Sequence, residues 1–414
     1  MKKQFLFLLV CIIMLSCTAQ KQKKKTIVKY MNPESSAAQI ALMTKIARRF
    51  EKKYPDIHIE LITGIKTEKI MAAIASGSGV DLFFNFMNIY SYIAAGSLVD
   101  LAPYISRYKM ETTDFFSFAM KEVTHGQKIY GLPVQLGTSC LAYNKALLEN
   151  ENIPLPAPYM SKEDFFRYIT TISSSQNRKD KAEKIFPLNS LNFIGYFESR
   201  ILSLLNPDGS YNKKSRSVIV ENMKTYQSIY KILPSQEELS SLSGGTTGAT
   251  AHFKMGKTFL QWCQAWMLVD LSRSKDLDFA VTGLPVFFNG HTASVSSLCI
   301  PAISAVPEAA FRFASFYVSE ESTDLFAAAK NGMSCRMSST GKFFTAPPDG
   351  IDYYISTMKR PDVFGKIPFT GNEEYIAGVR ELLYKLQKLQ ISAEQFTDQL
   401  YRLAGSVLKP VFEE

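Results

Sequence analysis

Cys17 is the residue whose position most clearly predicts a chemical modification. Residues 5–15 form an unbroken apolar run of eleven, preceded by two lysines, and Ser16 stands directly before Cys17. Eleven apolar residues are too few to cross a bilayer, which needs about 20, so the run predicts a cleaved export signal. The small Ser16 before Cys17 resembles the lipobox, the motif that lipoprotein signal peptidase cleaves. Met14 stands where the lipobox usually has leucine. The alternative is ordinary secretion after cleavage near Ala19.

Acylation of Cys17 would hold the mature protein on a bacterial membrane, on its periplasmic or cell-surface side. One acyl chain binds only marginally and stable anchoring needs about two, which a diacylated or triacylated cysteine supplies. Residues 1–16 would be removed as the signal peptide. Residues 17–25 would form a lysine-rich tether that can also meet anionic headgroups of the bilayer.

The other residues that could do covalent chemistry or bind a metal lack the spacing that such chemistry needs. The cysteines beyond the tether form no CxxC pair, the four histidines form no HExxH motif, and no GxSxG occurs. We therefore expect no enzyme activity, no metal and no cofactor. We interpret the four cysteines beyond the tether mainly as buried free thiols. The alternative is that two of them form one disulfide, whose partners the sequence does not assign. These four are Cys140, Cys263, Cys299 and Cys335.

The start of the chain alternates strands and helices, and these elements must position any binding residues. Strands are predicted over residues 27–31, 57–62 and 81–85. Apolar residues from Ile40 to Tyr54 recur at spacings of 3 and 4, which places them on one face of a helix. Asn32-Pro33 is expected to begin that helix as N-cap and first-turn proline. A shorter helix is expected over 66–76. Strands separated by helices predict a parallel α/β sheet, with ligands at the carboxyl ends of its strands.

A second region with its own strands and helices is expected over residues 139–280, with a glycine-rich surface loop at 243–248. The chain then ends in helices. Apolar residues from Ile376 to Leu389 form one stripe, and Ser392 with Gln395 forms a capping box that begins the last helix.

The length and net charge of the chain limit the functional classes to which the protein can belong. The 414 residues carry a net charge of +9, but six lysines lie in the first 25 residues, which leaves +3 for the body of the chain. So weak a charge, without a dense basic patch, argues against nucleic-acid binding. A body of this length is too long for one core, so two lobes are expected. No second apolar run could span a membrane, and we expect an exported monomer.

Six segments in register, within roughly residues 27–340, resemble a known family. They are Phe50–Ile57 (FEKKYPDI), Ala73–Phe83 (AIASGSGVDLF), Ala94–Leu101 (AAGSLVDL), Gly126–Pro133 (GQKIYGLP) running on through Tyr143–Lys145 to Ile153-Pro154, Phe253–Lys257 with Trp266, and Leu284-Pro285 with 309–316. Together they resemble the extracellular solute-binding proteins of ABC importers, in the sugar-binding subgroup that includes maltose-binding protein. The chain departs from the family pattern at Val80, where proline is usual, and at Gln264-Ala265, which replace a glycine before Trp266.

The resemblance implies a type II-like fold of two α/β lobes, each a mixed sheet flanked by helices, with the ligand cleft between them. Lobe 1 would take residues 26–135 and 296–334. Lobe 2 would take 139–294 and 338–414. The chain would cross between the lobes near 136–138, 294–296 and 334–337.

Sugar binding needs aromatic faces that stack on pyranose rings and planar polar groups that pair with hydroxyls. By resemblance, Trp266 matches the tryptophan that stacks on sugar in the family, whereas Trp262 is expected in the core. The expected ligand contacts are Trp266, Asn85, Asn88, Thr138, Asn32, Glu34, Ser35, Arg336 and Tyr196. Several have a structural alternative: Trp266 can lie in the core, the asparagines can cap helices, Glu34 can complement a helix dipole, and Arg336 can form a salt bridge.

The function that the resemblance implies is capture of a mono- or oligosaccharide and its delivery to the transmembrane permease of an ABC importer. Two alternatives keep the same fold. One is binding of a non-sugar solute such as a glycerol phosphate or a polyamine. The other is a surface lipoprotein repurposed for adhesion or signalling.

Overall fold

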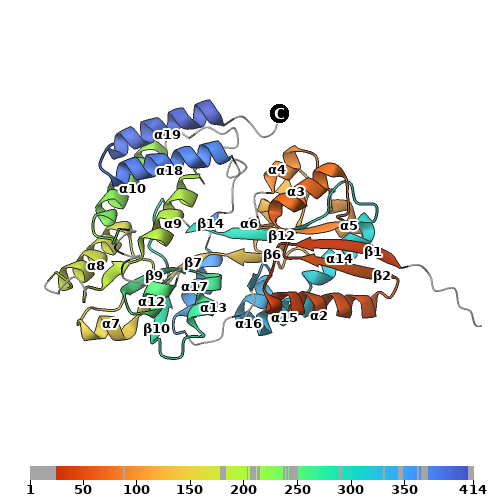
Figure 1. The fold of residues 1–414 in the computed structure, drawn as a ribbon, viewed down its shortest axis with the longest axis horizontal. Coiled ribbons are helices and arrows are strands. Elements are labelled where there is room, and N and C mark those ends of the chain that lie inside the picture. Colours follow the sequence, from red (N-terminus) through yellow and green to blue (C-terminus); the bar gives the residue numbers. More distant parts are fainter. Residues whose placement is uncertain are drawn as a thin grey trace, which may run out of the picture.

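The molecule has two halves, each built on its own β-sheet (Figure 1). The computed structural model describes residues 25–86, 89–177, 183–202, 204–205, 211, 215–235, 238, 241, 250–288, 291–329, 332–343, 348–360, 363–364 and 372–408. The sheet of the first half has the strand order β13-β6-β12-β3-β1-β2, and the sheet of the second half has the order β10-β7-β9-β8. This is the two-lobed mixed α/β architecture that the sequence predicts.

The first sheet brings the carboxyl ends of three strands to one edge. Its strands are β1 (Thr26–Asn32), β2 (Ile57–Thr63), β3 (Leu82–Asn85), β6 (Leu132–Gly137), β12 (Ser294–Cys299) and β13 (Met333–Ser334). β1 runs parallel to β2 and β3, whereas β12 runs antiparallel to both β3 and β6. β6 is therefore parallel to β1 and β3, and the carboxyl ends of all three face the second half of the molecule (Figure 1).

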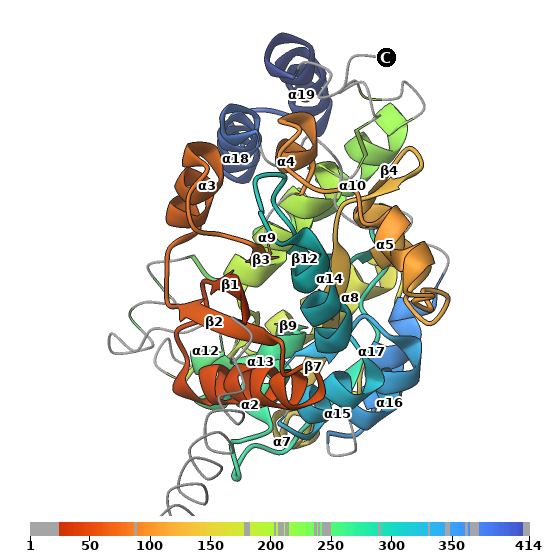
Figure 2. The ribbon, with the colours of Figure 1, turned by 90° about the vertical axis from the view of Figure 1, so that its right-hand side faces the viewer.

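Helices cover both faces of the first sheet (Figure 2). Their bounds, with those of the short strands between them, are α2 (Ala37–Lys53), α3 (Thr67–Ser76), α4 (Tyr90–Ala94), α5 (Ala102–Arg107), α6 (Ser117–Glu122), β4 (Thr124–His125), β5 (Lys128–Ile129), α14 (Pro307–Tyr317), α15 (Glu320–Ala328), η1 (Met337–Ser339) and α16 (Thr340–Phe343). α2, α14 and α15 pack on one another and on one face, and α3 and α4 contribute to a separate apolar cluster with Phe83 and Cys299.

The second sheet is likewise buried between helices. Its strands are β7 (Ser139–Asn144), β8 (Phe186–Leu188), β9 (Thr258–Gln264) and β10 (Phe279–Thr282), and a small ribbon joins β11 (His291–Thr292) to β14 (Val363–Phe364). The helices are α7 (Lys145–Asn150), α8 (Lys162–Ser175), α9 (Ser190–Leu202), α10 (Ser215–Tyr230), α12 (Ala251–Lys254), α13 (Ala265–Leu271), α17 (Ile351–Met358), α18 (Glu373–Gln387) and α19 (Ala393–Val407).

The apolar core continues from one half into the other. Leu136 and Val295 of the first sheet belong to the same buried cluster as Cys140, Cys263 and Tyr354 of the second half. The opposite face of the second sheet packs on α8, α9, α10, α18 and α19 in a separate cluster. The strands that join the halves therefore run through this shared core and not through an exposed linker. Close-packed interiors of this kind resist deformation.

The predicted strands and the shorter helix at the start of the chain are confirmed within one residue at each end, but α2 begins later than predicted. Asn32 still belongs to β1, where it pairs with Thr63, and α2 begins at Ala37 after the N-cap Ser36. The Asn32 side chain accepts a hydrogen bond from the Glu34 amide at 2.9 Å, which makes a turn instead of capping a helix. Pro33 lies in this turn.

The predictions for the end of the chain are confirmed except at one residue. Ser392 and Gln395 form the capping box of α19, with both reciprocal hydrogen bonds present. Leu389 is not part of the apolar stripe of α18, because the helix ends at Gln387 and the Leu389 side chain is 59% exposed. The predicted loop at 243–248 lies outside the described residues.

Thr138 lies between the last residue of β6 and the first residue of β7, so the chain passes from one sheet to the other there. It returns between β10 and β12. After β13 the chain stays with the first half longer than the predicted crossing at 334–337, because η1 and α16 pack against α15. It reaches the second half again by Asp349, whose carbonyl accepts a hydrogen bond from Val281 of β10 at 2.9 Å.

Candidate functional site

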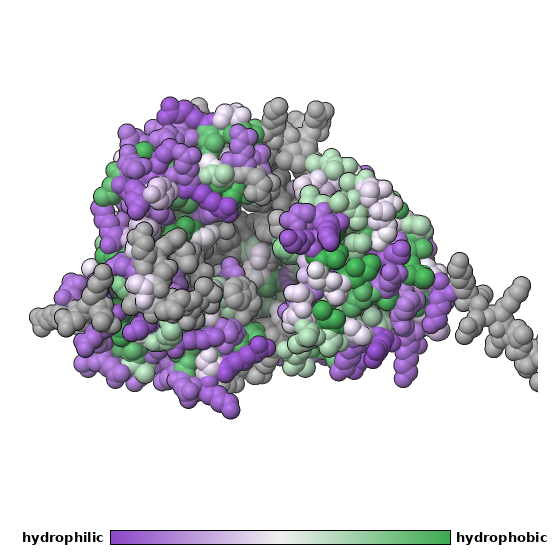
Figure 3. All heavy atoms as spheres, viewed as in Figure 1, coloured by the Kyte–Doolittle hydropathy of each residue, from purple (hydrophilic) through white to green (hydrophobic). Residues whose placement is uncertain are grey.

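Three polar residues stand at the carboxyl ends of three strands, on the edge of the first sheet that faces the second half, and Thr138 lies further toward that half than Asn32 and Asn85. Asn32 is the last residue of β1, Asn85 is the last residue of β3, and Thr138 directly follows β6. All three are buried, with at most 4% of each residue exposed. In α/β sheets ligands bind outside the carboxyl ends of strands, so this edge is the candidate site. The surface is hollowed between the two halves in the space-filling view (Figure 3).

The turn after β1 is ordered by its own polar groups. The Asn32 amide nitrogen donates to the Tyr30 hydroxyl at 2.7 Å and lies 3.2 Å from the Met43 sulfur. The Glu34 carboxylate accepts from the backbone amides of Ser35 and Ser36, at 2.9 and 2.6 Å. Glu34 therefore satisfies free N–H groups just before α2, which is the helix-end role that was the alternative to ligand contact. Ser35 is exposed.

The crossing at Thr138 is held by a residue from the second half. The Tyr354 hydroxyl, from α17, lies 3.4 Å from both the backbone nitrogen and the backbone oxygen of Thr138. It can accept from the first and donate to the second. Burial raises the pKa of Tyr354 far above its usual value, so the phenol keeps its proton.

The second half brings β9 to the same place. Gln264, the last residue of β9, pairs with Ser139, which directly follows Thr138. Gln264 is exposed although the six residues before it in β9 are buried. Trp266 is the second residue of α13, two positions beyond Gln264. The register therefore places Trp266, two residues after Gln264, in the second half next to the crossing.

Two polar residues of the second half were missed as contact candidates. Gln264 was noted only as a departure from the family pattern. Asn189 directly follows β8, which runs parallel to β9, and its side chain lies 3.4 Å from Nδ1 of His252. A polar residue directly after an apolar strand was the available signal, and it selected Asn32 and Asn85 in the first half.

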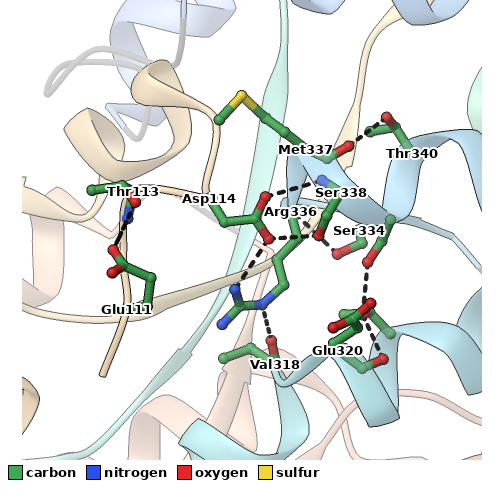
Figure 4. Close-up of polar contacts among 12 residues, drawn as sticks. Glu111, Thr113, Asp114, Val318, Glu320, Ser334, Arg336, Met337, Ser338 and Thr340 are labelled. Atoms are coloured by element: carbon green, nitrogen blue, oxygen red, sulfur yellow. Dashed lines mark hydrogen bonds and ion pairs between the residues drawn. The ribbon is translucent and has the colours of Figure 1, made fainter. Parts of the chain in front are cut away.

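Arg336 does not lie beside Thr138 at the crossing. β13 runs antiparallel to β6, so the chain moves from Met333 to Arg336 away from the carboxyl end of β6. The guanidinium instead forms an ion pair with Asp114 at 3.2 Å and donates to the Val318 carbonyl (Figure 4). It also covers the Phe115 ring at 4.5 Å. This is the salt-bridge role that was the alternative for this residue.

Asp114 is the centre of that network. Its carboxylate also accepts from the backbone amide and the hydroxyl of Ser338, at 3.0 and 2.6 Å (Figure 4). Burial alone would raise the pKa of Asp114, but the hydrogen bonds from Ser338 and the Arg336 charge outweigh it, so the pKa lies below its usual value. The network therefore ties η1 to the first half through a charged carboxylate at neutral pH.

Tyr196 also lies away from the edge. It is only 6% exposed, and its ring centroid lies 4.6 Å from that of Trp262, which is itself 1% exposed. Trp262 is thus in the core, as predicted, and Tyr196 packs against it. Asn88 and Cys17 lie outside the described residues.

No cluster of three or more histidine, cysteine, aspartate or glutamate side chains that could hold a metal occurs in the described part of the chain. Within the same residues, every helix is too short or too polar to cross a membrane.

The geometry agrees with the comparisons with known proteins. A family model for bacterial extracellular solute-binding proteins matches residues 45–349, which is most of the chain. The chain belongs to this family of solute-binding proteins. Members are exported, so the protein works outside the cytoplasm. None of the curated proteins matches the sequence.

Solved structures of solute-binding proteins share the fold along nearly their whole length. The sugar-binding protein MalE from Xanthomonas citri is 16% identical, with a TM-score of 0.75, over 92% of this chain and 97% of that one. An ABC substrate-binding protein from Listeria monocytogenes, solved with cycloalternan, is 17% identical, with a TM-score of 0.73, over 92% and 98%. A sugar transporter from Rhizobium etli in an open conformation is 15% identical, with a TM-score of 0.73, over 92% and 100%.

Proposed function

We propose that this solute-binding protein captures a mono- or oligosaccharide between its two lobes and delivers it to the permease of an ABC importer. The observation that supports this most is that β1, β3 and β6 direct their carboxyl ends, each with a polar residue, toward the second half, where Gln264 at the end of β9 pairs with Ser139 beside the crossing. Amide and hydroxyl groups of this kind pair with sugar hydroxyls. The solved proteins of the same fold that were crystallised with cycloalternan or named for sugar support the same class of solute.

The proposed contacts come from both halves. Asn32, Asn85 and Thr138 stand on the first half, with Ser35 exposed beside the first of them. Trp266 and Gln264 stand on the second half, and Trp266 would supply the aromatic face for a pyranose ring. Closure of the two halves would bring these groups together and remove water from their hydrogen bonds to the sugar.

The proposal predicts that sugars raise the melting temperature. We expect one sugar class to stabilise the mature, exported protein in a panel of sugars, polyols and polyamines. A ligand at about 1,000 times its Kd stabilises a protein by about 4 kcal/mol, which should raise Tm by several degrees. Calorimetry of the same pair should give a Kd that weakens at least about 10-fold in Trp266→Ala, if the ring stacks on the sugar.

Tyr384→Ala is the matched control, because Tyr384 is an aromatic residue that is 55% exposed on α18. It should leave the Kd unchanged. A panel in which only polyamines or polyols stabilise the protein would overturn the sugar assignment. An equal loss of affinity in both variants would remove Trp266 from the site.

We further propose that acyl chains on Cys17 anchor the protein. β1 begins at the outer end of the first half, away from the second half (Figure 1), so a tether attached there leaves the region between the lobes open. We expect the wild-type protein to partition with membranes and Cys17→Ser to be released into the soluble fraction. Mass spectrometry of the mature N-terminus is the measurement that decides, and an unmodified N-terminus near Ala19 would contradict the anchor.

A further inference from the structure

Cys140 and Cys263 face each other across two neighbouring strands, although 122 residues separate them in the sequence. Cys140 is the second residue of β7 and Cys263 is the sixth residue of β9, and the antiparallel register pairs them directly. In an antiparallel ladder, paired residues have Cα atoms about 4.5 or 5.5 Å apart, depending on the type of pair. Both distances lie within the range that a disulfide spans, about 4.4–6.8 Å.

The two side chains lie on the same face of the sheet. Both residues are fully buried in the apolar cluster that joins the halves, together with Tyr354. Burial raises the pKa of the Cys263 thiol well above its usual value, and a hydrogen bond with the Cys140 thiol adds to the rise. The two sulfurs are therefore neighbours.

The remaining two cysteines do not have such a partner in the described residues. Cys299 stands opposite Phe83 in the register of β12 and β3, and its sulfur lies 3.4 Å from the Ser297 hydroxyl. Cys335 directly follows β13, which pairs with Leu136 and Gln135 of β6. All four are free thiols in the structure, so one pair alone is placed for oxidation.

We propose that Cys140 and Cys263 form a disulfide in the exported protein, which joins β7 to β9 beside the crossing at Thr138. The compartment permits it, because disulfides form and persist outside the cytoplasm. The position gives it a role: Ser139, between Thr138 and Cys140, pairs with Gln264, so the bond fixes the strand ends that carry the second half of the proposed site.

The reaction is a thiol–disulfide exchange with a disulfide-bearing oxidant of the exported compartment. The thiolate of one cysteine attacks the oxidant's disulfide and forms a mixed disulfide, and one oxidant sulfur leaves as a thiolate. The thiolate of the second cysteine then attacks the mixed disulfide, closes the Cys140–Cys263 bond and releases the second oxidant thiolate. Two protons and two electrons leave the protein, and the oxidant becomes a dithiol. Because thiolates are the nucleophiles and burial suppresses them, the bond forms while the chain is still folding.

Peptide mapping tests the bond directly, because trypsin separates the four cysteines. The cleavage sites place them in peptides 129–145, 258–273, 276–312 and 331–336. The exported protein, purified without reductant, is unfolded in the presence of N-ethylmaleimide and digested. We expect peptides 129–145 and 258–273 to be linked, two hydrogens lighter than their sum, and the other two to carry the label. Labelled thiols on 129–145 and 258–273, or a link to either other peptide, would overturn the proposal.

Thermal unfolding gives a second test that does not depend on digestion. Reduction in denaturant followed by refolding with reductant should lower Tm by about 5 °C or more relative to the oxidised protein. The shift should persist in Cys299→Ser and vanish in Cys140→Ser, whatever the absolute Tm of each variant. A wild-type Tm that reductant leaves unchanged would count against the bond.

Discussion

Gly350→Ala should lower the free energy of unfolding by about 3–5 kcal/mol. Gly350 has φ +80°, a left-handed conformation that costs little for glycine alone, and an added Cβ would lie 1.9 Å from the Val281 carbonyl oxygen. The obstacle is backbone, so it cannot rotate away as a side chain would. Either α17 or β10 must shift. Urea denaturation followed by circular dichroism measures the loss.

The same variant also tests whether α17 supports the crossing. Gly350 is the N-cap of α17, and α17 carries the Tyr354 hydroxyl that contacts the backbone of Thr138. A shift of α17 should therefore weaken solute binding as well as stability. Tyr354→Phe separates the two effects, because it removes the hydroxyl and leaves the packing of the ring.

Gly405→Ala is the matched control for the glycine substitution. Gly405 lies in α19, and an added Cβ there would meet nothing within 4 Å. Alanine in place of a helical glycine stabilises by up to about 1 kcal/mol, so the change should have the opposite sign. If both variants unfolded at the wild-type urea concentration, the close approach of Gly350 to Val281 would not exist in solution.

Local sequence patterns predicted β1, β2 and β3 of the first sheet well because these elements are short and follow each other closely. β1, α2 and β2 lie within residues 26–63, and the apolar spacing alone defines the buried face of α2. The start of α2 was misplaced because Asn32 can cap a helix or close a turn. In the folded chain the turn forms, and the Asn32 amide nitrogen contacts Tyr30 and Met43. The sequence does not show these contacts.

The long-range pairings were beyond the sequence. Arg336 finds its partner Asp114 across 222 positions, so its position near a predicted crossing could not distinguish ligand contact from an ion pair. The alignment of Cys140 with Cys263 depends on the register of β7 against β9, which a single-residue slip would abolish. The residue type indicates what chemistry each side chain can do. Only the order and register of the strands indicate which residues lie next to it.

Trp262→Ala should lower the free energy of unfolding by about 3–5 kcal/mol, because it would leave a large cavity in the second half. The indole is 1% exposed and is surrounded by rings, with centroid distances of 6.2 Å to Phe165, 5.6 Å to Phe193 and 4.6 Å to Tyr196. Urea denaturation should show the loss. Tyr384→Ala, an exposed aromatic truncation, should change the free energy of unfolding by less than about 0.5 kcal/mol.

Trp262→Phe should cost much less, about 1–2 kcal/mol, because most of the ring stays in place. The indole Nε1 is buried without a hydrogen-bond partner, so its removal leaves no other polar group unpaired. The chain has two tryptophans, and this variant leaves Trp266 as the only one. Its fluorescence then reports on the proposed site alone. A stabilising sugar should shift or quench the emission with the Kd found by calorimetry, and an emission that does not respond would place Trp266 away from the sugar, even in a protein that binds it.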